Sequence, residues 1–380
     1  MSNLVISADG HIDLPCLPTS LFVEGASKSM RARMPHAIER DNGQLWVTAK
    51  GTPLGLVGGM GSAGRRYEPG QIHRADRMAE TGLYADQARG IMRTAIPALR
   101  IKDQERDGVV GEVIYGILGA TSRLDDPEAA TCMVKIYNDF AASEFARPYP
   151  DRFAMIGCLP IAEPEVAAEE TRRCAELGLK GVEIPVSDAM MPLWRDDWQP
   201  LWHALDETGL PLHLHTIGGK VDLSWVRGPE DRLKWLATHM TGFQMTMASQ
   251  LAAIIFSGAL ERHPRARVVI GESGLGWIPY VLERMDYEWE DQFQNLELKM
   301  KPSDYWHRQM FATFQLDEIG IVLLDRIGVE NVMWGSDFPH PDGVWPDSQE
   351  FLATQLADLS PESRRKVVHD NAACVYGFPN

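Results

Sequence analysis

Acidic and histidine residues stand directly after several short apolar runs of the sequence, where they could bind a metal ion. Asp9 and His11 follow the first run, and His215 ends the fifth. Glu272 ends the sixth run and Asp337 the eighth. Two imidazoles with one or two carboxylates suit a divalent ion such as zinc, manganese or iron. Such an ion lowers the pKa of bound water toward ~7, and Asp337 beside it could act as general base or acid.

Each of these residues alone also has an ordinary structural explanation. A histidine at a strand end is commonly a core or capping residue, and an aspartate in a loop commonly forms a turn or begins a helix. Glu272 before Ser273 and Gly274 could cap the helix that follows. The coincidence of such residues at the ends of four separate runs favours the metal site.

The elements that must position these residues are eight short runs, each nearly continuous in apolar residues. Strands buried on both faces have this pattern. The runs are 4–8, 109–115, 153–159, 181–185, 211–215, 267–272, 310–314 and 331–337. Helical patterns lie between most of them, such as 163–177, 198–208, 250–262 and 317–326.

Alternation of strands and helices predicts a parallel sheet, and eight repeats favour a closed (β/α)₈ TIM barrel over a doubly wound open sheet. Barrel enzymes place their catalytic groups at the carboxyl ends of the strands. Because residues two apart share a face of a strand, Asp9 and His11 can point to one side, as can His213 and His215. We therefore expect one barrel domain over 1–380 with the site at its mouth.

About a hundred residues separate the first two predicted strands. We interpret 15–105 as an insertion after strand one, part of which is rich in glycine. Loops after barrel strands lie over the active site, so the insertion could form a lid or a wall of the substrate pocket. A peripheral arm for contact between subunits is an equal alternative.

Composition excludes several classes of function. The formal net charge of −16 disfavours binding to nucleic acid or to an anionic membrane, because either needs a basic face. No run of 18 apolar residues predicts a membrane span, and the N-terminus lacks the pattern of a signal peptide. The five cysteines are scattered with no CxxC pair, which predicts reduced thiols in the cytoplasm.

The motifs that these residues form resemble the amidohydrolase superfamily, and within it the group of the aminocarboxymuconate semialdehyde and resorcylate-type decarboxylases. The likeness runs through most of the chain. The motifs are Ser7-Ala8-Asp9-Gly10-His11, Arg106-Asp107-Gly108-Val109, Tyr137-Asn138-Asp139, Leu212-His213-Leu214-His215, Gly271-Glu272-Ser273-Gly274-Leu275-Gly276-Trp277-Ile278-Pro279, Met333-Trp334-Gly335-Ser336-Asp337-Phe338-Pro339-His340 and Asp370-Asn371-Ala372-Ala373.

The resemblance implies a metal-dependent enzyme with one divalent ion, zinc first and manganese or iron as alternatives. It implies the ligands Asp9, His11, His215 and Asp337, although many family members have His or Glu where this chain has Asp9. Two-metal members use a lysine near the end of strand four, and here Lys180 lies at the start of that strand. The family also implies a homodimer that acts on a small molecule.

One motif departs from the decarboxylase pattern, in which His-x-Gly-Glu follows strand six. Here that segment reads Glu272-Ser273-Gly274-Leu275. We therefore expect a hydrolase of a small carbonyl compound first, in which Asp337 shuttles the proton of metal-bound water and His213 or Glu272 assists. The alternative is a non-oxidative decarboxylase of an aromatic or muconate-like acid, with Asp337 protonating carbon. A second alternative is a non-catalytic binding protein on the same fold.

Other residues could contribute to a substrate pocket. His340 follows Asp337 by three residues and could reach the pocket or orient Asp337, or simply pack in its loop. Trp345 is the tryptophan that we expect to line the substrate. Arginines of the insertion could bind a second carboxylate of an acid substrate; they are Arg31, Arg33, Arg65, Arg66 and Arg93.

Overall fold

Eight parallel strands form the centre of the computed structural model, which describes residues 4–41, 43–186, 190–215 and 224–379. They neighbour one another in chain order and pair in parallel throughout. The strands are β1 (Ile6–Ser7), β5 (Gly111–Ile114), β6 (Phe153–Cys158), β7 (Gly181–Pro185), β8 (Leu212–His215), β9 (Val268–Gly271), β10 (Met310–Phe314) and β11 (Val332–Trp334). Nearly all their residues are buried, as the apolar runs predicted.

Backbone hydrogen bonds across the first and last strands close the sheet into a barrel. The amide of Ala8 donates to the carbonyl of Trp334 at 2.8 Å, and the amide of Asp337 donates to the carbonyl of Asp9 at 2.9 Å. Gly335 allows this close approach, because a Cβ atom there would lie 2.3 Å from the Cβ of Asp9. The predicted (β/α)₈ barrel is confirmed.

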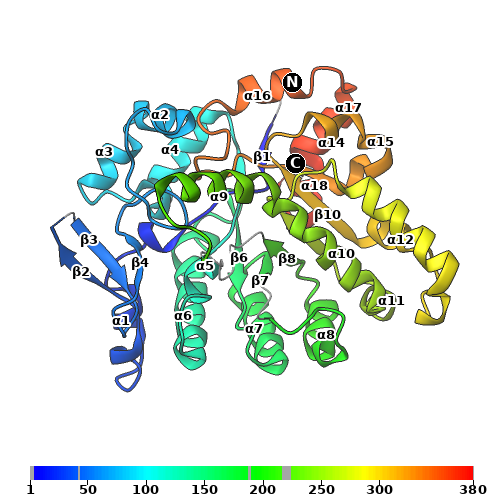
Figure 1. Cartoon of the computed structure of the whole chain (residues 1–380), viewed down its shortest axis with the longest axis horizontal. Coiled ribbons are helices and arrows are strands. Elements are labelled where there is room, and N and C mark those ends of the chain that lie inside the picture. Colours follow the sequence, from blue (N-terminus) through cyan, green and yellow to red (C-terminus); the bar gives the residue numbers. More distant parts are fainter. Residues whose placement is uncertain (1–3, 42, 187–189, 216–223, 380) are drawn as a thin grey trace.

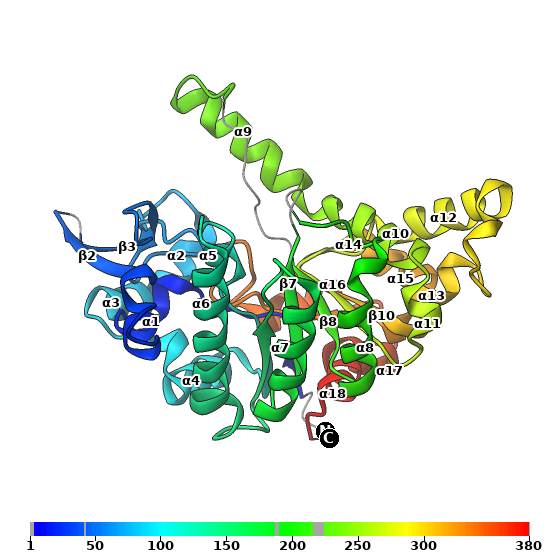
Figure 2. The ribbon, with the colours of Figure 1, turned by 90° about the horizontal axis from the view of Figure 1, so that it is seen from below.

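Helices surround the barrel and cover the outer faces of its strands (Figures 1 and 2). They are α4 (Pro97–Asp107), α6 (Pro127–Phe140), α7 (Pro164–Leu177), α8 (Gln199–Thr208), α10 (Met247–Phe256), α11 (Ala259–Arg262), α12 (Ile278–Gln292), α13 (Pro302–Gln309), α14 (Glu318–Val322) and α15 (Leu324–Ile327). The helix predicted over 250–262 is two helices, because Gly258 at φ 69° interrupts it. The helix predicted over 317–326 is likewise divided between α14 and α15.

The insertion after β1 contains a small sheet of its own, which the sequence did not predict. Three antiparallel strands form it, in the order β2 (His36–Arg40), β3 (Gly43–Val47) and β4 (Pro53–Leu56). Short helices flank it, namely α1 (Leu21–Gly25), α2 (His73–Glu80) and α3 (Leu83–Ala88). The insertion lies on one side of the barrel, where Figure 1 shows it in blue and cyan.

Two further groups of helices complete the fold. The helix α9 (Pro229–Gly242) extends as an arm from the barrel in Figure 2, and none of its residues is buried. The chain closes with α16 (Ser348–Gln355), α17 (Pro361–Arg365) and α18 (Asn371–Tyr376), and the short α5 (Leu118–Thr121) follows β5. Among the described residues, no helix has the length and apolar character needed to cross a membrane.

Candidate metal centre

Five of the residues singled out in the sequence converge at the carboxyl ends of the barrel strands. Asp9 and His11 follow β1, His215 ends β8, Glu272 follows β9 and Asp337 follows β11. The Nε2 atom of His11 lies 3.3 Å from Asp9 Oδ1 and 3.1 Å from Asp337 Oδ1. The Nε2 atom of His215 lies 3.6 Å from both Asp9 Oδ1 and Glu272 Oε2.

Asp9 is fixed by hydrogen bonds to only one of its two carboxylate oxygens. Its Oδ2 atom accepts from the amide of Glu272 at 2.9 Å and from the hydroxyl of Thr313 at 2.7 Å. Burial raises the pKa of Asp9, but His11 and His215 outweigh burial and hold that pKa well below its usual range. The other oxygen, Oδ1, therefore presents a negative charge to the two imidazoles.

The backbone is strained at two of the converging carboxyls. Glu272 has a φ of 49° and Asp337 a φ of 57°, in the left-handed region that residues with a Cβ atom rarely adopt. Such conformations persist only where the surrounding structure enforces them, and they cluster at functional sites. Both strained turns lie directly after barrel strands, so they direct these side chains into the mouth of the barrel.

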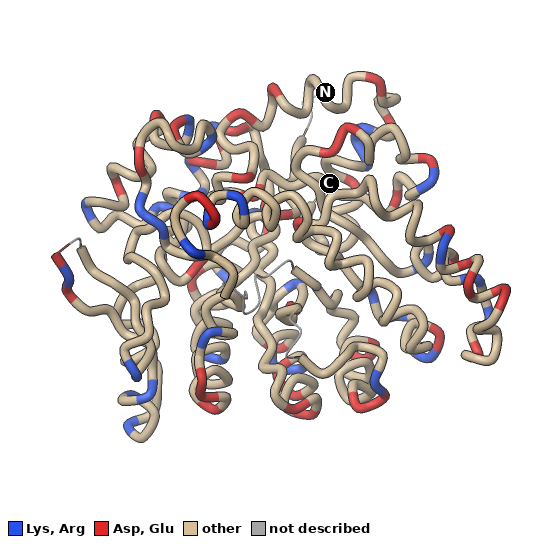
Figure 3. The backbone as a smooth tube through the Cα atoms, viewed as in Figure 1, with Lys and Arg blue, Asp and Glu red and all other residues tan. Residues whose placement is uncertain are grey.

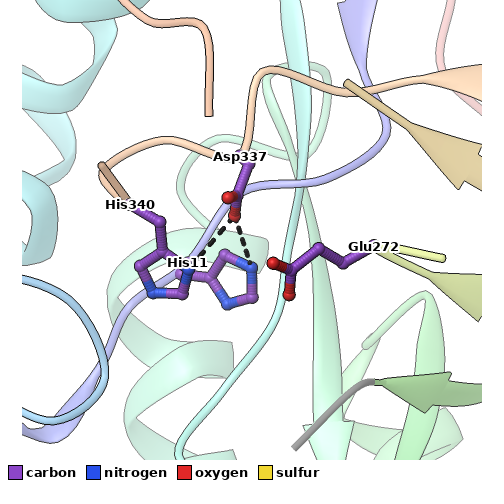
Figure 4. Close-up of side chains that lie close together, drawn as sticks. All are labelled: His11, Glu272, Asp337 and His340. Atoms are coloured by element: carbon purple, nitrogen blue, oxygen red, sulfur yellow. Dashed lines mark ion pairs between the residues drawn. The ribbon is translucent and has the colours of Figure 1, made fainter. Parts of the chain in front are cut away.

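His340 contacts both Asp337 and His11. Its Nδ1 atom lies 3.1 Å from Asp337 Oδ1, and its Nε2 atom lies 2.7 Å from Asp13 Oδ2. Its ring stacks on His11 with 4.0 Å between centroids (Figure 4). Burial lowers the pKa of His340, but Asp337 and Asp13 outweigh burial and raise that pKa well above its usual value. Of the three interpretations offered for His340, the structure places it both at the cavity and in contact with Asp337, where it can orient that carboxylate.

The donor atoms in this group fit a divalent metal ion. Several buried side-chain atoms there make no hydrogen bond: Asp9 Oδ1, His11 Nε2, His215 Nε2 and both carboxylate oxygens of Asp337. Leaving buried polar atoms unsatisfied is costly, and coordination of a cation removes that cost. Single donor atoms of Asp9, His11 and His215 all lie within 4.8 Å of one another, as do those of His11, Glu272, Asp337 and His340.

Glu272 differs from the other two carboxyls in its charge. Burial raises its pKa well above the usual value, and the neighbouring Asp337 and Asp342 raise it further. For Asp337, burial also raises the pKa, but His340 and His11 outweigh burial and lower it. In Figure 4 the carboxyl of Glu272 faces His11 and Asp337. The site thus combines aspartates whose pKa values are lowered with a glutamate whose pKa is raised.

A cavity of about 400 Å³ opens onto this group. His11, His215, Glu272 and His340 line its inner end. The walls come from three other segments: Gly61, Ser62 and Arg65 of the insertion, Gly116, Gly119 and Arg123 after β5, and Trp235, His239 and Phe243 of and beyond α9. The cavity has the size of a small-molecule binding site.

Two of the predicted site residues lie elsewhere. His213 points into the barrel below the cavity, where its Nδ1 atom lies 2.8 Å from the hydroxyl oxygen of Tyr115. Burial lowers the pKa of His213 to about 3, so it is neutral. Trp345 does not line the cavity; it packs on Phe338 with 4.5 Å between centroids and donates to the carbonyl of Asp103. Our expectation that Trp345 contacts substrate is therefore corrected, because its ring is committed to the core.

Three residues around the site went unnoticed in the sequence. Asp13 contacts His340, Tyr115 stacks on His11 and lies against His215, and Arg123 lines the cavity. Tyr115 ends one of the predicted strands, and Asp13 lies two residues past His11 and so on the same side of an extended chain. Those positions were the available signals, whereas nothing local marked Arg123.

Comparisons with known proteins place this chain in a family. A family model described as amidohydrolase matches residues 69–378. The γ-resorcylate decarboxylase of Rhodococcus jostii is 28% identical over 297 residues, covering 74% of this chain and 87% of that protein. The 2-amino-3-carboxymuconate-6-semialdehyde decarboxylase of Dictyostelium discoideum is 24% identical over 291 residues, covering 75% and 77%. The chain belongs to the amidohydrolase family, and it is an enzyme.

Solved structures share the fold across the chain. An amidohydrolase from Mycobacterium avium subsp. paratuberculosis superposes with a TM-score of 0.77 at 19% identity, covering 99% of this chain and all of that one. A dihydroxybenzoic acid decarboxylase from Polaromonas, with bound manganese and 2-nitroresorcinol, superposes with a TM-score of 0.63 at 20% identity, covering 79% and 92%. The relatives' names describe decarboxylation, which favours our alternative interpretation over the hydrolase that we expected first.

Proposed function

We propose that this protein is a metal-dependent, non-oxidative decarboxylase of an aromatic or muconate-like acid. The observation that carries the proposal is a carboxyl with a raised pKa, Glu272, which lies 3.6 Å from His215 at the point where Asp9, His11, His215 and Asp337 converge. Relatives named as decarboxylases of such acids support it.

The four residues Asp9, His11, His215 and Asp337 would hold the ion. When bound, the ion supplies a Lewis acid that polarises the oxygens of the substrate. We propose manganese as the first ion to test, because the Polaromonas decarboxylase contains it, with zinc as the second. Both ions accept imidazole and carboxylate ligands.

Glu272 is the residue that we propose as the proton donor. Decarboxylation breaks the bond between the carboxylate carbon and the substrate carbon that bears it. The carboxylate leaves as carbon dioxide, and the substrate carbon takes up a proton. A donor must hold a proton, and burial favours the protonated form of Glu272 by raising its pKa. Asp337, our earlier candidate, is held ionised by His340 and His11 and so suits metal binding better.

A second candidate is hydrolysis, which one observation favours. The position of the decarboxylase motif's glutamate is occupied by Leu275, whose side chain is fully buried in the core. No second acid therefore stands at that position to manage a proton. Hydrolysis would use the same metal group, with Glu272 assisting the leaving group.

The experiment that separates the two candidates is a substrate panel with two readouts. The manganese and zinc forms would be incubated with 2,6-dihydroxybenzoate, other hydroxylated benzoates and muconate-like acids, while evolved carbon dioxide and the decarboxylated product are measured. We expect release from at least one acid and none with His215→Ala. Cleavage of amides or lactones without carbon dioxide release from any acid would contradict the proposal and support hydrolysis.

We also propose roles for the parts of the molecule that no comparison addresses. The insertion over 15–105 forms a wall of the substrate pocket, since Gly61, Ser62 and Arg65 line the cavity. The homodimer and the cytoplasmic location remain predictions.

A further inference from the structure

Three arginines line the cavity, and they differ in their surroundings. Arg65 of the insertion and Arg232 of α9 are exposed, whereas Arg123, two residues after α5, is half-buried. Burial lowers the pKa of Arg123, and the nearby charge of Asp13 only partly opposes this. Arg123 is therefore the arginine of this cavity that water solvates least.

Arg123 has no carboxylate partner in the described part of the chain. Its Nε atom donates to the carbonyl of Gly119 at 2.9 Å, and neither of its Nη groups makes a hydrogen bond with a described residue. The nearby carboxylate of Asp13 is already in contact with His340, 2.7 Å away. The two Nη groups thus remain available at the cavity wall.

The two arginines that are buried, Arg100 and Arg93, are paired with carboxylates, whereas the half-buried Arg267 donates to the backbone carbonyls of Val375 and Gly209. Arg100 donates to both carboxylate oxygens of Glu112, and Arg93 donates to Asp103. Arg33, which we considered for substrate binding, forms ion pairs with Asp126 and Glu128 outside the cavity. A guanidinium removed from water needs such a partner, because burying a charge without one is costly. Among the residues that the structure describes, Arg123 has neither a carboxylate nor a carbonyl on its Nη groups, and the cavity that it lines is the place from which a ligand can supply one.

We propose that Arg123 binds a second carboxylate of the substrate, remote from the one that leaves, so that the substrate is a dicarboxylic acid. A guanidinium with both Nη groups available matches the two oxygens of a carboxylate. The metal group and Arg123 line the same cavity, so one small molecule can contact both. This inference rests on the proposed function for the reaction, and it adds the class of substrate.

The test measures binding without turnover. The manganese-loaded protein would be titrated calorimetrically with isophthalate, which carries two carboxylates, and with benzoate, which carries one. We expect the wild type to bind isophthalate at least about ten-fold more tightly than benzoate, the size expected for a hydrogen-bonded charge pair. Arg123→Met should lose that preference and leave benzoate binding within about two-fold of wild type.

Two further variants make the result specific. Arg147→Met removes an exposed arginine that does not line the cavity, and should bind both ligands as the wild type does. Arg123→Lys keeps the positive charge but lacks the two Nη groups of a guanidinium, so it should retain part of the preference for isophthalate over benzoate. This variant tests the proposal even where Arg123→Met folds poorly. An unchanged preference in Arg123→Met, or no preference in the wild type, would overturn the inference. If no acid is decarboxylated but Arg123→Met loses the preference, the proposed reaction fails while the binding role stands.

Discussion

At the scale of single residues, the two carboxyls that follow β9 and β11 have pKa values shifted in opposite directions for a physical reason. Asp337 faces His11 and His340, whose partial or full positive charges stabilise its anion. Glu272 is as deeply buried but faces Asp337 and Asp342, so a second negative charge there is unfavourable. Environments that push two carboxyls apart in pKa mark one as the proton donor.

This difference gives distinct expectations for substitution of the two carboxyls. Glu272→Gln should lower kcat at least about hundred-fold, the usual contribution of a proton donor, while the metal content stays unchanged. Asp337→Asn should lower metal content and activity together, because it removes a ligand. Steady-state kinetics beside elemental analysis of each variant would check both expectations. Full activity in Glu272→Gln would refute the donor role.

At the scale of elements, the strands could be predicted because burial on both faces leaves a local signature. All eight apolar runs correspond to strands of the barrel. Their order placed Asp9, His11, His215, Glu272 and Asp337 at one end, and the structure brings these five together. Parallel pairing in chain order made that convergence predictable, because the carboxyl ends of all strands then share one edge.

The features that the sequence did not predict depend on contacts between residues far apart in the chain, and no local sequence pattern indicates such contacts. The sheet β2–β4 lies in a glycine-rich stretch that we read only as an insertion. His213 shares a strand face with His215, yet lies one layer below the cavity, and the period of two cannot distinguish these layers. The pairing of His340 with Asp13 joins residues 327 positions apart. The sequence did not mark Arg123, because the proposed role depends on the absence of a carboxylate partner among the described residues of the folded structure, which no sequence pattern shows.

A contact between α4 and α16 gives an expectation for the pH dependence of stability. Burial raises the pKa of Asp107 to about 7, although hydrogen bonds from Ser348 oppose the shift. An unfolded aspartate has a pKa of about 3.9, so between these values the folded protein holds the extra proton. The free energy of unfolding should therefore fall as pH rises through that window, by up to about 1.4 kcal/mol per pH unit, and level off above pH about 7.

Asp107→Asn should remove this contribution. Urea unfolding at pH 5, 6, 7 and 8 would show the stability of wild type minus that of the variant declining with pH. Asp358→Asn changes an exposed carboxyl and serves as the control, since its difference from wild type should stay flat. A flat difference for Asp107→Asn as well would show that Asp107 is ionised throughout.

At the scale of the whole molecule, the metal group lies on the seam that closes the barrel. Asp9 and His11 follow the first strand and Asp337 follows the last. His215 ends the fifth strand of the barrel and Glu272 follows the sixth, on the side opposite the seam. Lys and Arg are interspersed with Asp and Glu along the outer helices that Figure 3 draws, in a chain whose net charge is −16. The carboxylates of Asp9 and Asp337 both contact His11 Nε2 at the seam, so a cation bound there would connect the first and last strands of the barrel.

Binding of the ion should therefore stabilise the entire barrel. A ligand that binds only the folded state, present at a hundred times its Kd, adds about 2.7 kcal/mol to the free energy of unfolding. For a chain of this size we expect manganese or zinc to raise Tm by about 2–5 °C over protein treated with chelator.

Elemental analysis should find about one equivalent of metal, as a mononuclear site requires. His215→Ala should lose both the bound metal and the shift, since His215 is the only imidazole ligand that we propose from the side of the barrel opposite the seam. No metal and no shift in the wild type with either ion would contradict the metal site and, with it, the proposed reaction.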